Sequence, residues 1–468
     1  MMYPRLYVAR NLLADDGAIF ISIDDHELSN LKKICDDVLG EENYKGTIVR
    51  ATGQTTGQDS GGLGSSFDYV LVYFKQPDVE MSGLPLSDED VERYEGEDAK
   101  GKFALWQLRK TGSSDRREDR PTMFYPAIAP DGTEIWPIGP TGYESRWRFD
   151  PKGYKKLVED DYIVWKKRKN NGAEEWWPYV KTYLEGRTKR PSPLWDDLEG
   201  SKKASIDLRD LIGKKVFDNP KPVGLIKRLI EIAPDMSTDS LVLDFFAGSG
   251  ATGQAVLELN TLDEGNRRFI LVQLPENTRV QKKDGSWIET EASKAGYKTI
   301  ADITKDRVRR FIQRCEKESE GKLNLGSKPK AGFRVLKLAT SNFNVWEAAT
   351  ETTTPEALGQ QLELHIDHIQ KGRASEALLY EILLKSGFPL TTPVETFGID
   401  GKAVHSVANG AMVICLALQL THEAIKGIAD LKPERVVCLD QGFAGNDQLK
   451  TNAVLIMKSK GVTKFQTI

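Results

Sequence analysis

"DSLVLDFFAGSGATGQAVLELN", residues 239–260, reads as an apolar strand that runs into a Gly-x-Gly turn and then into a helix. Asp244 ends the strand, and Gly248 and Gly250 form the turn. In an open parallel sheet, ligands bind outside the carboxyl ends of the strands, and glycines there let the backbone approach the ligand closely. The stretch therefore predicts a site for a nucleotide-like ligand, although a glycine turn can also serve packing alone.

The glycines do not identify that ligand. A dinucleotide site has the pattern G-x-G-x-x-G, followed about 20 residues later by an acid that binds the ribose hydroxyls. Gly248, Gly250 and Gly253 have this spacing, but the next strand, "RRFILVQL", brings Gln273 to the place of the acid. A Rossmann-type dehydrogenase is therefore one alternative, and Gln273 argues against it.

Length and charge limit the class of protein. The chain has 468 residues, and a single domain usually has roughly 100 to 200, so about two to four domains are expected. The formal net charge is −4 and the isoelectric point is about 5.9. A polyanionic partner would therefore have to bind at local basic patches rather than be attracted by the net charge.

The sequence shows no sign of a membrane segment. No apolar run approaches the roughly 18 to 20 residues that a membrane-spanning helix needs. The N-terminal stretch "MMYPRLYVARNLL" contains neither the apolar region nor the cleavage site of a signal peptide. These features predict a cytoplasmic protein without a membrane partner.

No metal site or disulfide framework is expected. The cysteines are scattered and form no CxxC pair, which is typical of reduced, packed thiols. They are Cys35, Cys315, Cys415 and Cys438. His365 and His368 in "HIDH" have no further cluster of ligands near them in the sequence, so we expect them on a helix surface rather than at a metal.

Residues 1–75 alternate helix and strand signals, which predicts an α/β sheet. The strands are "AIFISI" and "FDYVLVYFK". Asp24 and Asp25 follow the first strand and are expected to cap the second helix rather than to form a catalytic pair of acids. The first helix is expected to present one apolar face made of Leu6, Val8, Ala9, Leu12 and Leu13.

Residues 76–205 have a different composition and are expected to form a separate insert. Seven of the nine tryptophans lie there, among basic runs: Trp106, Trp136, Trp147, Trp165, Trp176, Trp177 and Trp195. Tryptophans can stack on bases while lysines and arginines neutralise phosphates. The predicted DNA contact is "DYIVWKKRKN", with Trp165, Lys166, Lys167, Arg168 and Lys169. For any single residue, a solvated face or a core position stays open as the alternative.

Strand and helix signals alternate again after the insert. Residues 206–325 contain the glycine turn, the strand "RRFILVQL" and the helix "ADITKDRVRRFIQRCEK". Residues 330–468 hold a further α/β pattern that includes "GAMVICLAL" and "ERVVCLD". This order predicts a parallel α/β sheet followed by a C-terminal α/β domain.

Several motifs together resemble one family. "DFFAGSG" resembles the S-adenosylmethionine loop of DNA amino-methyltransferases, and "NPKP", residues 219–222, is similar to the start of the helix beside the methionine end of their cofactor. The first segment looks like the stretch that follows the catalytic tetrapeptide in adenine-specific methyltransferases, the modification subunits of type III restriction-modification systems. "FDYVLVYFK", "YPAIAPDGTEIWP" and "WDDLEG" resemble their target-recognition region. The order of these motifs is that of the permuted β class.

The resemblance implies a Rossmann-like methyltransferase sheet in circularly permuted order with an inserted target-recognition domain. It implies transfer of a methyl group from S-adenosylmethionine to adenine N6, with double-stranded DNA, a second copy of the chain and a restriction subunit as partners. Lys221 would face the cofactor carboxylate, and Gln273 would bind the ribose through its amide. The implied cofactor-binding residues are Asp244, Phe246, Gly248, Gly250, Thr252, Lys221 and Gln273.

One departure from the family concerns catalysis. These enzymes bind the flipped base with an Asp or Asn, two prolines and an aromatic residue, and the 468 residues contain no such tetrapeptide. The family's order places this motif upstream of Met1, so the chain resembles the portion that follows it. The alternative is a non-catalytic DNA-recognition protein that keeps the fold and the cofactor pocket. The catalytic residues stay unknown at this stage.

Overall fold

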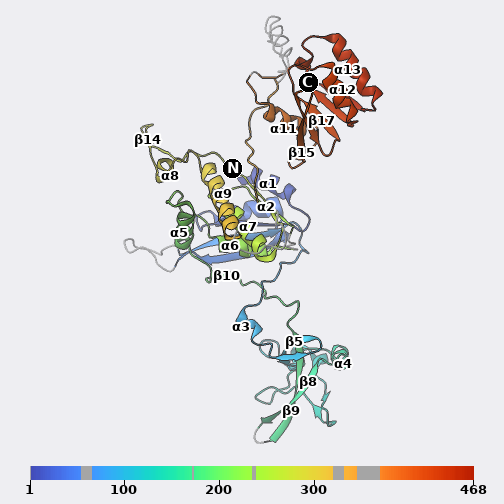
Figure 1. The fold of residues 1–468 in the computed structure, drawn as a ribbon. Helices are drawn as coiled ribbons and strands as arrows, with labels where there is room; N and C mark the ends of the chain where they lie inside the picture. The colour runs from blue at the N-terminus through green and yellow to red at the C-terminus, as the bar shows by residue number, and fades with distance from the viewer. Residues whose placement is uncertain are drawn as a thin grey trace. The chain divides into compact units, whose positions relative to one another are not determined.

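The computed structural model describes residues 2–53, 66–170, 173–234, 239–319, 331–344, 369–370 and 372–468 (Figure 1). His365 and His368 lie outside these residues. The chain divides into two compact units, Met1–Phe333 and Arg334–Ile468. Both units combine helices with strands, which confirms the predicted α/β class. In the part of the chain described, no helix has the length and apolar character that a membrane crossing requires.

The N-terminal segment builds a four-stranded sheet in the order β1-β3-β2-β10. Its strand β3 is antiparallel to both β1 and β2, and β10 is parallel to β2. Helices α1 and α2 cover one face, where Leu71 and Tyr73 are buried. The opposite face, with Val70 and Val72, packs against α6. The bounds are α1 Met2–Leu12, β1 Ala18–Ile23, α2 Leu28–Leu39, η1 Glu41–Asn43, β2 Tyr44–Ala51, β3 Phe67–Phe74, β10 Leu194–Trp195 and α6 Val223–Ile232.

Two local expectations for this segment are wrong. In α1 the buried side chains are Leu6 and Ala9, whereas Val8 and Leu12 are 56% and 65% exposed. The reason is the helical period of 3.6 residues, which turns position 8 about 200° away from position 6. Neither Asp24 nor Asp25 caps α2: its N-cap position is Glu27, which makes no side-chain capping hydrogen bond.

The glycine turn lies in a second, smaller sheet of two parallel strands, β11 (Leu241–Asp244) and β12 (Arg268–Leu271). Helix α7 (Ala251–Asp263) starts directly after the turn, and α5 (Ser201–Ile212) and α9 (Ile300–Ser319) belong to the same region. Helix α6 links the two sheets, because its Leu225 packs on the four-stranded sheet while its Ile230 packs on α7.

Within the first unit, the Trp-rich region contains its own antiparallel sheet in the order β4-β5-β9-β8 (Figure 1). An isolated bridge between Leu84 and Lys189 joins the chain where it enters and leaves this region. Trp195 packs instead against the four-stranded sheet. The bounds are α3 Asp88–Val91, β4 Gly96–Asp98, β5 Gly101–Gln107, η2 Arg117–Asp119, η3 Pro121–Met123, β6 Ala127–Ile128, β7 Glu134–Ile135, α4 Pro151–Glu159, β8 Ile163–Asn170 and β9 Ala173–Tyr183.

The second unit is a five-stranded sheet in the order β15-β16-β17-β18-β19. Helices α12 and α13 pack on one face and α11 on the other. Cys415 and Cys438 are buried in this unit, and both are free thiols. The bounds are α11 Ser375–Lys385, β15 Val394–Ile399, β16 Lys402–Val407, β17 Met412–Cys415, α12 His422–Asp430, β18 Arg435–Cys438, η4 Asp440–Phe443, α13 Asp447–Ser459 and β19 Lys464–Thr467.

Candidate functional site

Asp244 ties the end of β11 to the loop and to the first turn of α7. Its Oδ1 accepts a hydrogen bond from the Phe246 backbone N–H at 3.0 Å, and its Oδ2 accepts one from the Thr252 hydroxyl at 2.6 Å. Thr252 is only 5% exposed. In this structure both residues therefore brace the loop, and the Thr252 hydroxyl is directed at Asp244.

The two glycines of the turn have backbone conformations that other residues rarely adopt. The φ angle is +51° at Gly248 and +81° at Gly250. A Cβ added to Gly250 would lie 3.0 Å from Thr304 Cγ2 and 3.2 Å from the Thr304 carbonyl oxygen. At Gly248 the nearest atom to an added Cβ is Phe217 Cζ, at 3.4 Å. The sequence correctly singled out both glycines, and the structure shows that Gly250 has the stricter requirement.

Gln273 also supports the loop from within. Its Oε1 accepts a hydrogen bond from the Gly248 N–H at 2.7 Å, and its Nε2 donates to the Leu274 carbonyl at 3.1 Å. The expectation that this amide binds a ribose stays a prediction. In the structure its oxygen fixes the turn, as a backbone acceptor would.

Helix α9 supplies two residues to the loop that the sequence reading missed. The Thr304 hydroxyl donates to the Gly248 carbonyl at 2.6 Å. The Arg307 guanidinium is 2% exposed and donates to Ser249 Oγ and to Gln254 Oε1, both at 2.9 Å. Burial lowers the pKa of Arg307 to about 10, so it stays charged near neutral pH. The available signal was a pair of polar residues, three apart, on the buried face of an amphipathic helix.

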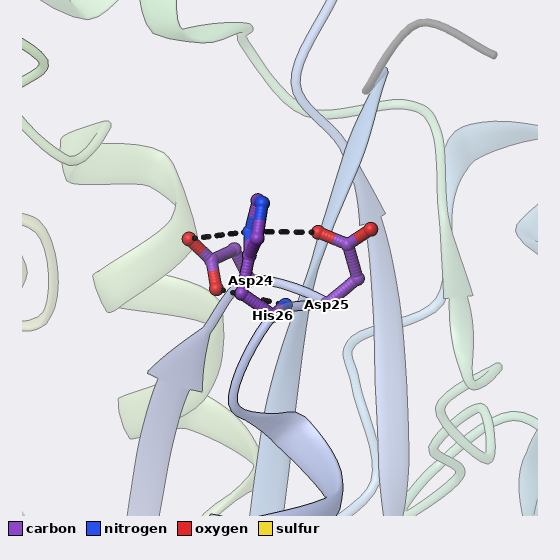
Figure 2. Close-up of side chains that lie close together, drawn as sticks. All are labelled: Asp24, Asp25 and His26. Atoms are coloured by element: carbon purple, nitrogen blue, oxygen red, sulfur yellow. Dashed lines mark hydrogen bonds and ion pairs between the residues drawn. The ribbon is translucent and has the colours of Figure 1, made fainter. Parts of the chain in front are cut away.

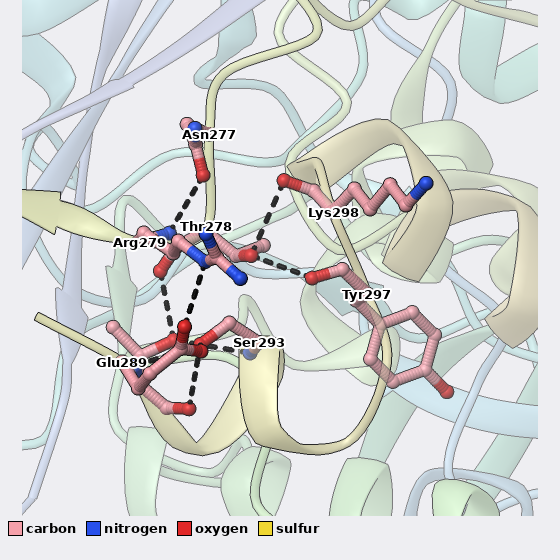
Figure 3. Close-up of polar contacts among 8 residues, drawn as sticks. Asn277, Thr278, Arg279, Glu289, Ser293, Tyr297 and Lys298 are labelled. Carbon is pink, nitrogen blue, oxygen red and sulfur yellow. Dashed lines mark hydrogen bonds and ion pairs between the residues drawn. The ribbon is translucent and has the colours of Figure 1, made fainter. Parts of the chain in front are cut away.

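A polar network fixes the excursion that leads into α9 (Figure 3). The Thr278 hydroxyl donates to the Tyr297 carbonyl at 2.6 Å, and Arg279 forms an ion pair with Glu289 at 2.8 Å. The excursion contains β13 Val280–Gln281, β14 Trp287–Ile288 and α8 Glu291–Lys294. By joining its two ends, the network sets where α9 begins and so where Thr304 and Arg307 lie.

Lys221 forms an ion pair within the protein. Its Nζ lies 2.7 Å from Asp68 Oδ2, and Asp68 also accepts two hydrogen bonds of 2.9 Å from the guanidinium of Arg50. Burial acts to raise the pKa of Asp68, but the hydrogen bonds from Arg50 and Lys221 keep that pKa below its ordinary value. A cofactor carboxylate at Lys221, which stays a prediction, would therefore share the ammonium group with Asp68.

The aromatic pair before the glycines connects the loop to the N-terminal segment. Phe245 packs against the core beneath α1 and α2, whereas Phe246 is 56% exposed. The guanidinium carbon of Arg5 lies 5.8 Å from the centre of the Phe246 ring. The loop therefore presents one exposed aromatic ring beside the carboxyl ends of β11 and β12.

The five predicted DNA-contacting residues lie on β8, within a hairpin with β9. Cross-strand pairing places Lys166 opposite Trp177 and Lys167 opposite Trp176. Because side chains alternate along a strand, Trp165, Lys167 and Lys169 occupy one face and Lys166 and Arg168 the other. The four basic residues are exposed, and Trp165 is partly buried. The structure thus divides a set that appears continuous in the sequence.

Aromatic rings support the basic side chains on both faces of this hairpin. Lys167 Nζ lies 4.9 Å from the centre of the Trp176 ring, and the Arg168 guanidinium lies 5.1 Å from that of Tyr179. Glu174 and Glu175 stand opposite Lys169 and Arg168 and offset part of the positive charge. The major groove of DNA is wide enough to admit such a two-stranded ribbon.

Asp24, Asp25 and His26 form a cluster of potential metal ligands between β1 and α2 (Figure 2). His26 Nδ1 lies 3.5 Å from Asp24 Oδ2 and 3.3 Å from Asp25 Oδ1. All three residues are exposed, and Asp24 Oδ1 accepts a hydrogen bond from the His26 N–H at 3.2 Å. Asp24 therefore stabilises the turn that leads to the helix, which explains why it does not cap the helix itself.

Comparison with known proteins gives the family. Residues 1–302 match the DNA methylase family N6_N4_Mtase. The chain is 31% identical to the Mod subunit of the type III restriction-modification enzyme EcoPI of Escherichia phage P1, over 97% of this chain and 70% of the relative. It is 33% identical to the type II methyltransferase M.KpnI of Klebsiella pneumoniae, over 66% of this chain and 72% of the relative.

A solved structure, TTHA0409 of Thermus thermophilus in complex with S-adenosyl-L-methionine, shares 13% identity and a TM-score of 0.27, covering 66% of this chain and 75% of that one. So low a score supports no conclusion about function. The match over residues 1–302 and the identity to the EcoPI Mod subunit do settle the family. The chain belongs to the N6/N4 DNA methylase family, to which the Mod subunits of type III restriction-modification enzymes are similar over nearly its whole length.

Proposed function

We propose that the protein is a site-specific DNA methyltransferase of a type III restriction-modification system, which transfers a methyl group from S-adenosylmethionine to adenine N6. The observation that carries the proposal is the braced glycine loop at the carboxyl end of β11, in a chain of the DNA methylase family. A ligand at this position is expected from the general behaviour of parallel sheets.

The residues around the loop fit S-adenosylmethionine. Phe246 and Leu274, 56% and 58% exposed, follow the carboxyl ends of the two strands and offer apolar surface to a purine ring. The left-handed glycines leave room for the ligand beside the backbone. Asp244, Gln273 and Arg307 hold the loop in place, so little conformational entropy remains to be lost when the ligand binds.

When bound, S-adenosylmethionine supplies an activated methyl group on its sulfonium. The adenine amino nitrogen forms the new bond to the methyl carbon, the bond from that carbon to sulfur breaks with its electrons going to sulfur, and the amino proton leaves to solvent or a base. The contribution of this chain is to hold the donor in line with the amine, a positioning role that needs no covalent intermediate. The target base must also be flipped out of the duplex.

The cofactor is tested by calorimetry on the 468-residue chain. S-adenosylmethionine should bind with one site per chain, and a nicotinamide dinucleotide should show no binding at the same concentrations. The reason is that Gln273, rather than an acid, follows the second strand, and its oxygen is already bonded to Gly248. Binding of the dinucleotide alone would instead support the dehydrogenase alternative.

For the DNA partner, we propose that the β8–β9 hairpin binds the duplex with one of its faces. Lys167→Ala with Lys169→Ala removes two charges from one face, and Lys166→Ala with Arg168→Ala removes two from the other. The double variant on the DNA-facing side should lower the salt dependence of binding, in a plot of log K against log salt, by about 1.8. The other double variant serves as the control with equal loss of charge.

Fluorescence anisotropy with a labelled duplex, at several salt concentrations, measures both slopes. If the two double variants keep the slope of the unchanged chain, these side chains are solvated and the hairpin is not the DNA contact. If both lower it equally, the ribbon is inserted in a groove with both faces in contact.

The remaining expectations complete the proposal. Residues 76–205 would be the target-recognition insert between the two parts of a permuted methyltransferase domain, residues 1–75 and 206–325, and residues 330–468 a separate C-terminal domain. A homodimer and a restriction subunit are the proposed protein partners, by analogy with Mod subunits. A DNA substrate is consistent with a cytoplasmic location.

A further inference from the structure

A second surface of the Trp-rich sheet contains a pocket of about 370 Å³, away from the basic run on β8. Trp106 on β5 is paired with Val180 on β9, and both line the pocket, so its floor is one face of the β5–β9 pair. Arg148 and Phe149 form part of the wall, and Arg187 comes from the segment after β9. Residues distant in the sequence therefore build one concave site.

The aromatic content of this pocket is unusual for a surface. Trp106 is 47% exposed, and Tyr94 and Phe149 line the same pocket. Most tryptophans bury most of their area, so an exposed one in a concave site indicates a contact surface. Stacking on such rings is how proteins hold the bases of unpaired nucleotides, whatever the base.

The charge of the pocket is positive and is not offset. Two arginines and no acidic residue line it. Arg148 donates to the Gln107 carbonyl at 2.9 Å, and Arg187 to the Tyr183 carbonyl at 3.2 Å. Within the described ranges, neither guanidinium forms an ion pair with a carboxylate. Both arginines therefore have charge available for an anion.

Two further arginines lie behind Arg148 and strengthen the field. Arg109 and Arg146 are 9% and 7% exposed, and Asp115, 3.6 Å from Arg109, is the carboxylate that accompanies them. Burial, followed by repulsion from Arg146 and Arg109, lowers the pKa of Arg148. Such a concentration of like charge is relieved when an anion binds beside it.

We infer that this pocket holds one nucleotide of a DNA strand, with its base against Trp106 and its phosphate between Arg148 and Arg187. The inference rests on the proposed function, since it concerns how the same enzyme holds its DNA. It adds a second contact, on residues separate from the hairpin basic run, and it specifies a stacked base rather than phosphate contacts alone.

The test uses the full 468-residue chain and a duplex that carries 2-aminopurine, a fluorescent adenine analogue, at an unpaired position. Binding should quench the fluorescence through stacking on Trp106. Trp106→Ala should abolish the quenching and weaken binding about tenfold. Arg187→Ala should lower the salt slope by about 0.9 while the quenching remains. The matched controls are Trp136→Ala, which removes another exposed tryptophan of this region, and Arg190→Ala, which removes an exposed arginine three residues away.

Each outcome decides one question. If the unchanged chain binds DNA and Trp106→Ala binds and quenches equally well, the pocket inference is wrong while the proposed function stands. If the unchanged chain binds neither DNA nor S-adenosylmethionine, the proposed function fails first. Competition by free deoxyadenosine monophosphate at the level of the oligonucleotide would show a site for mononucleotides and would also overturn the inference. Equal melting temperatures of all variants establish that the fold is unchanged.

Discussion

The 468-residue chain is expected to bind S-adenosylmethionine and DNA yet to transfer no methyl group between them. No two prolines are adjacent anywhere in the sequence, so the Asp/Asn-Pro-Pro-aromatic tetrapeptide of DNA amino-methyltransferases is absent from it. That motif accepts the amino hydrogens of the flipped adenine and stacks on its ring. Without it, binding does not become stabilisation of the transition state.

The measurement is incorporation of tritium from methyl-labelled S-adenosylmethionine into duplex DNA. The rate should be on the order of 10³-fold or more below that of a chain extended at its N-terminus by a segment carrying Asp-Pro-Pro-Tyr, by comparison with the loss of one positioned catalytic group. The matched control is the same extension with the tetrapeptide replaced by four alanines. Calorimetry should show equal affinity of all three proteins for the cofactor.

Robust incorporation by the 468-residue chain would mean that another residue takes the part of the tetrapeptide, and the expectation from the family's motif order would be wrong. Loss of cofactor binding in this chain would be a different failure, because it would concern the glycine loop. Absence of transfer even after extension would favour the alternative of a DNA-recognition protein that keeps the cofactor pocket.

Gly250→Val is expected to remove cofactor binding, with at least a tenfold loss of affinity and a lower melting temperature. The φ of +81° makes a side chain at this position strained, at a cost of roughly 1–2 kcal/mol. The new Cβ also meets the Thr304 carbonyl at 3.2 Å, and a backbone atom cannot move aside as a side-chain end can. Relief of that contact would shift the loop away from α9.

The matched control is Gly248→Val, in the same loop. Its φ of +51° carries a similar strain, but the nearest atom is the ring of Phe217, at 3.4 Å from an added Cβ, which can shift. We expect this variant to bind more weakly than the unchanged chain and more tightly than Gly250→Val. Isothermal calorimetry gives the affinities, and thermal unfolding gives the stabilities. Equal affinity of the Gly250→Val variant and the unchanged chain would show that the loop is not the cofactor site.

Local patterns in the sequence are sufficient for the strand, turn and helix of residues 239–260. Apolar runs determine β11 and α7, and a Gly-x-Gly turn requires positive φ angles that the structure has at Gly248 and Gly250. The α/β class and the family resemblance follow from the same kind of information, because they depend on the order of short motifs. Periodicity was less reliable for α1, where neighbouring apolar residues point to opposite sides.

The partners of the polar side chains depend on the tertiary structure alone. Lys221 pairs with Asp68, 153 residues away, and Arg307 reaches Ser249 across 58 residues. The basic run on β8 is divided between two faces only because β9 pairs with it in one register. Local pattern reflects the period of an element, whereas these contacts are set by how separate elements pack, so the sequence alone identified the glycine loop but not the residues that hold it.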